Sequence, residues 1–368
     1  VRHPLAHDDG RGGRGVRAVS PALPPIQIVD LAQELREGNR GIFSRALEGA
    51  LAETLERGDQ AILFLNRRGS ASFVLCRDCG YVPQCSGCSV PYTVHLAGER
   101  LRCHQCNRQR RMPGCCPGCG GARLRFFGLG TQRVEAEVRS RFPVARVIRW
   151  DRDVARKATD HAEILVALAQ GEADVVVGTQ MLAKGHDLPN VTLVGVVSAD
   201  TALHMPDYRS GERAYQLLTQ VAGRTGRGVK PGRVIVQTYT PEHYAIRAAA
   251  TNDYEAMFQA EMRVRREAGY PPFGRLSRLL YSHTNAGYAE EEAHRFATEL
   301  REVRALRGLA GVEVIGPAPA FHARARGRWR WQVVLRAHDP GEVLAGISLR
   351  RGWSVDVDPV TLLRTSNE

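Results

Sequence analysis

The sequence predicts an α/β fold in which a parallel sheet carries an inserted metal-binding module and is followed by a smaller α+β domain. Three observations support this prediction. Strand-length runs of Val, Ile and Leu alternate with segments of helical periodicity up to about residue 240, as in a parallel sheet covered on both faces. Four C-x2-C pairs interrupt this pattern within 44 residues. After about residue 241 the chain changes to long helical segments and a strand pair.

The elements of the first part are expected in a regular order. A helix is predicted over 39–57, where apolar residues recur three or four positions apart before Gly58. A strand follows at 61–65 and ends in Asn-Arg-Arg-Gly. Beyond the cysteines, helices are predicted over 131–141, 161–170 and 211–222, and strands over 145–150, 173–180, 192–200 and 232–239.

The last part has a different composition of elements. Helices are expected over 244–266 and 288–306, and strands over 311–316, 328–336 and 353–359. The predicted organisation is therefore a flexible lead-in at 1–25, a lobe at 26–75 and 120–240, a metal-binding insertion at 76–119, and a C-terminal domain at 241–368.

Charge favours nucleic acid as a partner. The net charge is +12 and the pI is about 9.6, and all but three of the basic residues are arginines. Arginine forks onto phosphate oxygens and stacks on bases, although a charged, inert surface is the alternative interpretation. No apolar run is long enough to span a bilayer and the first twenty residues have no apolar signal core, so we expect a cytoplasmic protein with reduced thiols and no membrane partner.

Eight of the nine cysteines form the C-x2-C pairs, and Cys115 is left over. Two such pairs complete a tetrahedral shell, so the spacing predicts two four-cysteine metal sites. A disulfide framework is the alternative, but it belongs to secreted chains. Spacing permits either sequential or nested pairing of the four motifs. Closed tetrathiolate sites favour two structural Zn²⁺ ions per chain, with iron as the alternative.

The segment QVAGRTGR, from Gln220 to Arg227, closes a predicted helix. Its Q-x-x-G-R-x-G-R pattern is the signature of superfamily 2 helicases, in which arginines reach the γ-phosphate of ATP from across a cleft. The alternative is a Gly-Arg loop that only binds anions. The upstream segment VVVGTQMLAKGHDLPNVTLVGVVSAD stands at the spacing that the helicase interpretation requires.

Several long segments together resemble primosomal protein N′, the PriA family of replication restart helicases. They are LFLNRRG, LCRDCGYVPQC, LRCHQC, GLGTQRVE, DRD, GTQMLAKGHDLPNVTLV, QLLTQVAGRTGR and RGRWRWQVVLR, and the resemblance runs from Ile26 to Pro359. It implies a RecA-like second helicase lobe with an inserted two-zinc, eight-cysteine module, and corresponds to the family's C-terminal portion. The implied activity is ATP-dependent 3′-5′ unwinding of DNA at stalled forks, with primosome proteins and single-strand-binding protein as partners near the nucleoid.

The resemblance also assigns roles to residues. It implies nested metal sites, with Cys76, Cys79, Cys116 and Cys119 in one and Cys85, Cys88, Cys103 and Cys106 in the other. By the same resemblance Gln220, Arg224 and Arg227 are catalytic, Gly185 and Asp187 line the nucleotide edge, and Thr179 and Gln180 lie at the DNA-facing end.

A second basic feature lies at 321–336, where Trp329 and Trp331 alternate with Arg328 and Arg330. On a strand this alternation sends the tryptophans to one face and the arginines to the other. We expect the tryptophans to be core residues and the arginines to contact phosphates, with a tryptophan face that stacks on bases as the alternative.

The sequence has no Gly-rich loop ending in Gly-Lys-Ser/Thr and no Asp-Glu dipeptide. We therefore expect ATP and Mg²⁺ to be bound only in a complete helicase, and this polypeptide alone to have no ATPase activity. Two hypotheses follow: part of a longer helicase, or a non-catalytic zinc-stabilised scaffold for DNA and the primosome.

Overall fold

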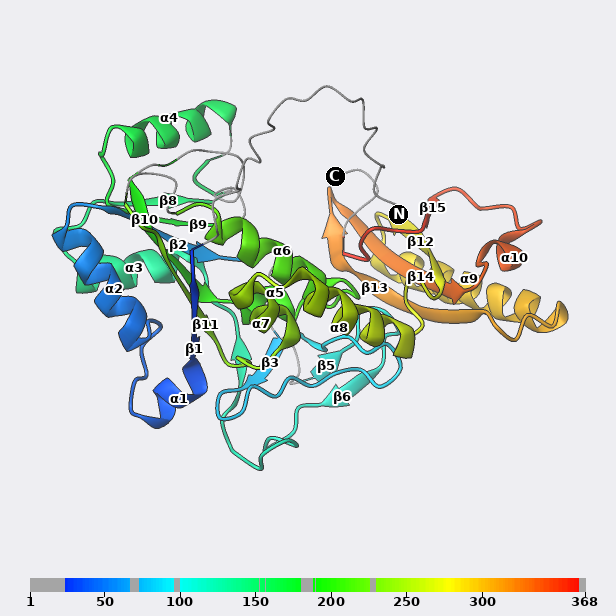
Figure 1. The fold of residues 1–368 in the computed structure, drawn as a ribbon. Helices are drawn as coiled ribbons and strands as arrows, with labels where there is room; N and C mark the ends of the chain where they lie inside the picture. The colour runs from blue at the N-terminus through cyan, green and yellow to red at the C-terminus, as the bar shows by residue number, and fades with distance from the viewer. Residues whose placement is uncertain are drawn as a thin grey trace, which may run out of the picture.

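The computed structural model describes residues 24–66, 73–95, 100–151, 153–155, 157–179, 188, 190–225 and 230–363. These residues form a six-stranded sheet, a five-stranded sheet around the cysteines and a four-stranded sheet (Figure 1). Most of the expected lead-in lies outside them. No helix in these ranges is both long enough and apolar enough to cross a membrane.

The six-stranded sheet forms the lobe and is parallel throughout. Its strand order is β1-β11-β10-β2-β9-β8. The strands are β1 (Ile26–Asp30), β2 (Gln60–Leu65), β8 (Val147–Trp150), β9 (Val175–Gly178), β10 (Val191–Ser198) and β11 (Arg233–Thr238). The predicted strands are confirmed. Strand β1 is an additional edge strand, which the sequence pattern did not predict because it is short and mixes polar and apolar residues.

Helices cover both faces of this sheet, because successive strand residues point in opposite directions. Ile62 and Phe64 of β2 face one core and Ala61 and Leu63 face the other. The second core contains α2 (Arg45–Glu56) and α3 (Thr131–Arg141); the first contains α4 (Ala158–Ala169), α6 (Ser210–Ala222) and α7 (Tyr244–Thr251). Short helices α1 (Leu31–Arg36) and α5 (Asp200–Leu203) follow β1 and β10.

The cysteine module is inserted between β2 and α3. Its strands are β3 (Phe73–Cys76), β4 (Thr93–His95), β5 (Arg100–Arg102), β6 (Gln109–Arg111) and β7 (Leu124–Phe127). The first and last of these pair antiparallel, with Phe73 opposite Phe127. The module therefore leaves the lobe and returns to it on neighbouring strands, and β7 is an edge strand of its sheet.

The C-terminal domain is an antiparallel sheet in the order β13-β14-β12-β15, with one long helix packed on it. Its elements are β12 (Arg275–His283), α9 (Ala286–Leu306), β13 (Glu313–Ala325), β14 (Arg328–Ala337), α10 (Gly341–Leu344) and β15 (Trp353–Val357). Phe296 of α9 packs with Leu279, Val333 and Trp353 from three of the strands. The predicted α+β arrangement is confirmed.

The helix expected over 244–266 is instead two helices, α7 and α8 (Tyr254–Glu267). Asn252 adopts a left-handed conformation with φ of 53°, and the Asp253 side chain accepts a hydrogen bond from the backbone N–H of Ala256. These two residues end one helix and cap the next. Helix α7 and Met257 of α8 belong to the lobe core, so that core extends beyond the expected boundary at residue 241.

The end of the described chain packs back onto the lobe. The Asp207 carboxylate accepts hydrogen bonds from the Leu362 backbone N–H, at 3.1 Å, and from the Thr361 hydroxyl. The Tyr208 hydroxyl donates to the carbonyl oxygen of Pro359 at 3.0 Å. The C-terminal domain is thus tied to the start of α6 by polar contacts.

Candidate metal centres and motor motifs

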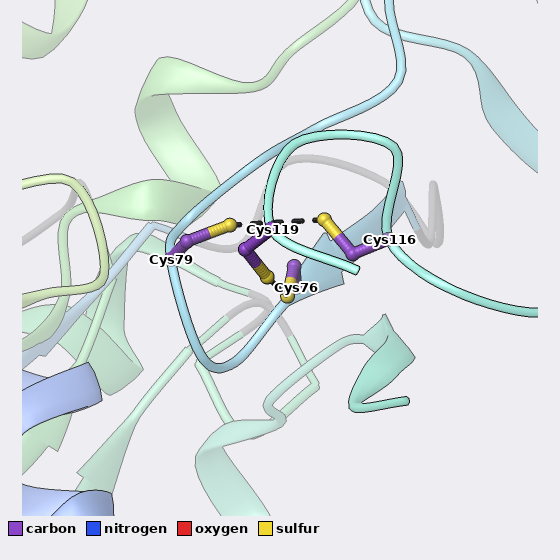
Figure 2. Close-up of side chains that lie close together, drawn as sticks. All are labelled: Cys76, Cys79, Cys116 and Cys119. Atoms are coloured by element: carbon purple, nitrogen blue, oxygen red, sulfur yellow. Dashed lines mark hydrogen bonds between the residues drawn. The ribbon is translucent and has the colours of Figure 1, made fainter. Parts of the chain in front are cut away.

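The eight paired cysteines converge in two groups of four. Figure 2 shows the first group, in which Cys76 and Cys79 face Cys116 and Cys119 from the two ends of the module. The Sγ atoms of Cys79 and Cys116 are 3.7 Å apart, as are those of Cys76 and Cys119. The second group consists of Cys85, Cys88, Cys103 and Cys106. The pairing is nested, as the family resemblance implied, and the sequential alternative is wrong.

These sulfur positions fit zinc. A tetrahedral ion with Zn–S bonds of about 2.3 Å separates its sulfurs by about 3.8 Å, and the sulfurs of each group lie within 4.8 Å of one another. Burial and the adjacent thiols raise the pKa of Cys79 to about 12, and a bound cation would stabilise its thiolate form. The two groups therefore hold two zinc ions. Cys115 is exposed and belongs to neither group.

All four C-x2-C pairs form the same turn. The N–H of the first cysteine donates to the carbonyl five residues later, at 2.8–2.9 Å in every turn. The residue after the second cysteine donates back to the carbonyl of the first and has positive φ; these residues are Gly80, Ser89, Asn107 and Gly120. Such turns aim both thiols at one point. Gly and Asn after a C-x2-C pair are the sequence signal for them.

The outer zinc site packs against the lobe through Gly80. A Cβ at Gly80 would lie 2.3 Å from the carbonyl oxygen of Tyr239, just beyond β11. The neighbouring Arg77 donates from Nε to the Tyr239 hydroxyl at 3.0 Å. The first turn of the module is therefore fixed to the carboxyl edge of the lobe sheet.

The inner zinc site packs against the C-terminal domain. The Tyr270 hydroxyl lies 2.7 Å from the carbonyl oxygen of Cys88 and donates to it. His104 is buried, and its Nδ1 lies 3.0 Å from the carbonyl oxygen of Pro319, while Gln332 donates to the His104 carbonyl. His104 is thus a docking residue and not a metal ligand. The two zinc sites hold the lobe and the C-terminal domain on either side of one module.

The Gln-to-Arg motif lies at the end of α6. Gln220 is exposed on the last turn, and Gly223 is the C-cap. Arg224 follows, partly exposed, and its backbone N–H donates to the carbonyl of Val221 at 3.0 Å. The Thr225 hydroxyl donates to the carbonyl of Val191 at 2.9 Å, which fixes this loop to the first residue of β10. The motif is therefore placed at the amino edge of the lobe sheet.

Thr179 lies at the opposite edge. It follows β9, is buried, and its N–H donates to the carbonyl of Trp150 at 3.3 Å. The other residues predicted for these motifs, namely Gln180, Gly185, Asp187 and Arg227, lie outside the described residues. The roles of all seven motif residues remain predictions.

The alternating tryptophans and arginines lie on β14 as expected, but with one correction. Trp331 is buried in the core of the C-terminal domain and Trp329 packs against it, which confirms the core interpretation. Arg328 is exposed, whereas Arg330 is only 7% exposed. The expectation that both arginines contact phosphates is therefore wrong for Arg330, because its side chain is buried.

A buried carboxylate that the sequence interpretation missed lies under the carboxyl edge. Asp200, fully buried at the start of α5, accepts hydrogen bonds from the Thr238 hydroxyl at 3.0 Å and the Tyr239 N–H at 3.2 Å. Burial raises the pKa of Asp200 to about 6. Burial also lowers the pKa of His204, 4.0 Å away, to about 3. The Ser-Ala-Asp sequence after a buried strand was the available signal.

Comparison with known proteins gives matches along most of the chain. Residues 135–229 match the helicase conserved C-terminal domain, 85–111 the PriA DNA helicase Cys-rich region domain, and 266–360 the primosomal protein N C-terminal domain. The lobe is thus a RecA-like helicase C-terminal lobe.

Similar curated proteins carry the description replication restart protein PriA. The one from Bacillus subtilis (strain 168) is 50% identical over 314 residues, which cover 85% of this chain and 38% of the relative. That from Synechocystis is 43% identical over 94% of this chain and 42% of the relative, and that from Treponema pallidum is 36% identical over 94% and 53%. The chain spans about two fifths to one half of the length of these relatives.

Proposed function

Because this chain belongs to the PriA family of replication restart proteins and matches their C-terminal portion, we propose that it works as the second motor lobe of an ATP-dependent 3′-5′ DNA helicase. In this role the lobe closes on ATP bound by a first lobe, while the zinc module and C-terminal domain position forked DNA. The proposed setting is the cytoplasm, at the nucleoid. The proposed partners are primosome proteins and single-strand-binding protein.

The observation that carries this proposal is the placement of Arg224. The Thr225–Val191 hydrogen bond and the Gly223 cap hold Arg224 at the amino edge of the sheet, on the rigid end of a 13-residue helix. An arginine presented from one lobe to the γ-phosphate on another stabilises the charge that develops during phosphoryl transfer. Gln220 and Arg227 would orient the same phosphate, and Gly185 and Asp187 would border the nucleotide.

DNA binding is proposed for the opposite edge. Thr179 and Gln180 follow β9, where a strand of DNA crossing the carboxyl edge would contact them. Arg328 is exposed at the start of β14 and would contact a phosphate from the C-terminal domain. Because the zinc shells are closed by four thiolates, zinc supplies rigidity here and leaves no open position for a water molecule.

A chimera tests the function. This chain replaces the corresponding C-terminal portion of the Bacillus subtilis relative. ATP hydrolysis by the chimera is measured with and without DNA, and unwinding is measured on forked DNA. We expect DNA-stimulated hydrolysis and 3′-5′ unwinding. A chimera that binds forked DNA but neither hydrolyses ATP nor unwinds would favour the alternative, a zinc-stabilised scaffold without catalysis.

A further inference from the structure

A hollow of about 180 Å³ lies where the module's edge strand β7 meets the carboxyl edge of the lobe sheet. From the lobe it is lined by Val197 and Ser198 at the end of β10 and by Tyr239 after β11. From the module it is lined by Phe126 and Phe127. Among the described residues, four arginines also line it and no carboxylate does; the arginines are Arg40, Arg77, Arg125 and Arg133.

These arginines differ from the others in the lobe. Across the described parts of 24–66 and 120–240, eleven arginines lie within 4.0 Å of a carboxylate: Arg36, Arg45, Arg57, Arg123, Arg139, Arg141, Arg146, Arg149, Arg209, Arg213 and Arg233. Arg40, Arg125 and Arg133, in contrast, have no carboxylate within 4.0 Å among the described residues. All three line the same hollow, so no carboxylate in the described parts of the chain neutralises its positive charge.

The hollow places guanidinium groups beside an exposed aromatic ring, which suits an anion that is attached to a planar base. Tyr239 fixes Arg77 by the hydrogen bond at 3.0 Å and by the ring itself, whose centroid is 5.8 Å from Cζ. Arg125 donates from Nη1 to the carbonyl oxygens of Ala122 and Leu124, which orients the rest of its guanidinium. Phe126, adjacent to it on β7, is 48% exposed. Single-stranded nucleic acid is typically bound by guanidinium groups that donate two hydrogen bonds to a phosphate and by an exposed aromatic ring on which a base stacks.

The residues next to this hollow carry the opposite charge. A second hollow, which shares Tyr239, is lined by three carboxylates (Asp30, Asp78 and Glu242) and by one arginine, Arg36. The buried Asp200 carboxylate is enclosed by its own hydrogen-bond donors and does not line either hollow. A polyanion is therefore attracted to the arginine side and repelled from the carboxylate side.

We propose that the arginine-lined hollow binds the sugar-phosphate backbone of a single DNA strand, with Phe126 stacking on a base. This inference rests on the proposed function for its ligand. The hollow lies at the β1-β11-β10 end of the carboxyl edge, and Thr179 lies beyond β2 on the same edge. The lobe therefore has two separate contacts with nucleic acid, and the second one is shared with the zinc module.

The test is binding of a labelled oligothymidylate by the zinc-loaded chain, followed by fluorescence anisotropy over a range of salt concentrations. The variant Arg125→Ala/Arg133→Ala removes two exposed arginines of the hollow, and Arg263→Ala/Arg351→Ala removes two exposed arginines elsewhere as the matched control. We expect the first variant to bind about 100-fold more weakly, at about tenfold per charged contact. Its slope of log affinity against log salt should fall by about 1.4, for two phosphates. Phe126→Ala should bind about tenfold more weakly with the slope unchanged.

Zinc content and unfolding midpoint establish that each variant is folded. Equal binding by the two double variants would overturn this proposal and leave the proposed function intact. A wild-type chain that does not bind the oligonucleotide at all would overturn both. Competition by ATP, inorganic phosphate or polyglutamate at concentrations equal to the oligonucleotide would also overturn it, because the hollow would then accept other anions and not a DNA strand.

Discussion

Alanine at Gly80 should destabilise the protein far more than alanine at Gly120, although both glycines occupy the same place in equivalent turns. Their φ angles are 76° and 72°, so the left-handed backbone costs about 1–2 kcal/mol at either site. A Cβ at Gly120 meets nothing within 4 Å, but one at Gly80 meets the Tyr239 carbonyl oxygen at 2.3 Å and Thr240 Cγ2 at 2.8 Å. Because the obstacle is backbone, the turn must move. Overpacking of about 1–3 kcal/mol and loss of the Arg77 hydrogen bond, about 1 kcal/mol, then add to the cost.

We therefore expect losses of about 3–6 kcal/mol for Gly80→Ala and about 1–2 kcal/mol for Gly120→Ala. Urea unfolding of the zinc-loaded proteins measures both, and metal analysis must find two zinc ions in each variant. Equal losses, or a larger loss for Gly120→Ala, would refute the reasoning, because the outer zinc site would then not pack against the Tyr239 backbone.

Two further predictions concern the metal sites and pH. The double variant Cys76→Ser/Cys116→Ser should retain one zinc ion per chain by metal analysis, because both cysteines serve one site; sequential pairing would leave none. Asp200→Asn should make stability fall more steeply on acidification. Because the pKa of Asp200 is raised in the folded state, its protonation adds roughly 3 kcal/mol to the free energy of unfolding as pH falls from about 6 toward 4. Because the pKa of His204 is lowered, that residue removes about the same amount as pH falls below 6.5. Urea midpoints between pH 7 and 4 should therefore fall more steeply for Asp200→Asn than for the wild type; parallel curves would contradict this.

Much of the architecture follows from residue pattern alone. Continuous apolar runs such as Val191–Ser198 are unmistakable strands, and the four C-x2-C pairs predict metal because two thiolates at that spacing reach one ion. The nested connectivity came from family resemblance. Spacing could not decide it, because the choice depends on antiparallel pairing of β3 with β7, whose paired residues are about 50 positions apart.

The remaining features depend on tertiary contacts that no local pattern encodes. Alternation on β14 placed Trp331 correctly in the core, yet it could not reveal that the other face is also covered at Arg330. The sequence did contain a signal for the helix break, since Asn252 and Asp253 are both residue types that favour helix caps. The helical periodicity on either side nevertheless led to the prediction of one continuous helix. The hollow lined by Arg40, Arg125 and Arg133 also includes Tyr239, 199 positions after Arg40, so it becomes visible only when these segments fold together.

The most direct test of the account is the turnover of ATP by the chimera when Arg224 is replaced. An arginine that reaches the transferred phosphoryl group contributes about 10³-fold or more to kcat. We predict that Arg224→Ala lowers kcat for DNA-stimulated hydrolysis by at least about that factor, with zinc content and DNA affinity unchanged. Arg233→Ala, a control at an exposed arginine on β11, should leave kcat as it is. A chimera whose Arg224→Ala variant hydrolyses ATP as fast as the unsubstituted protein would contradict the account.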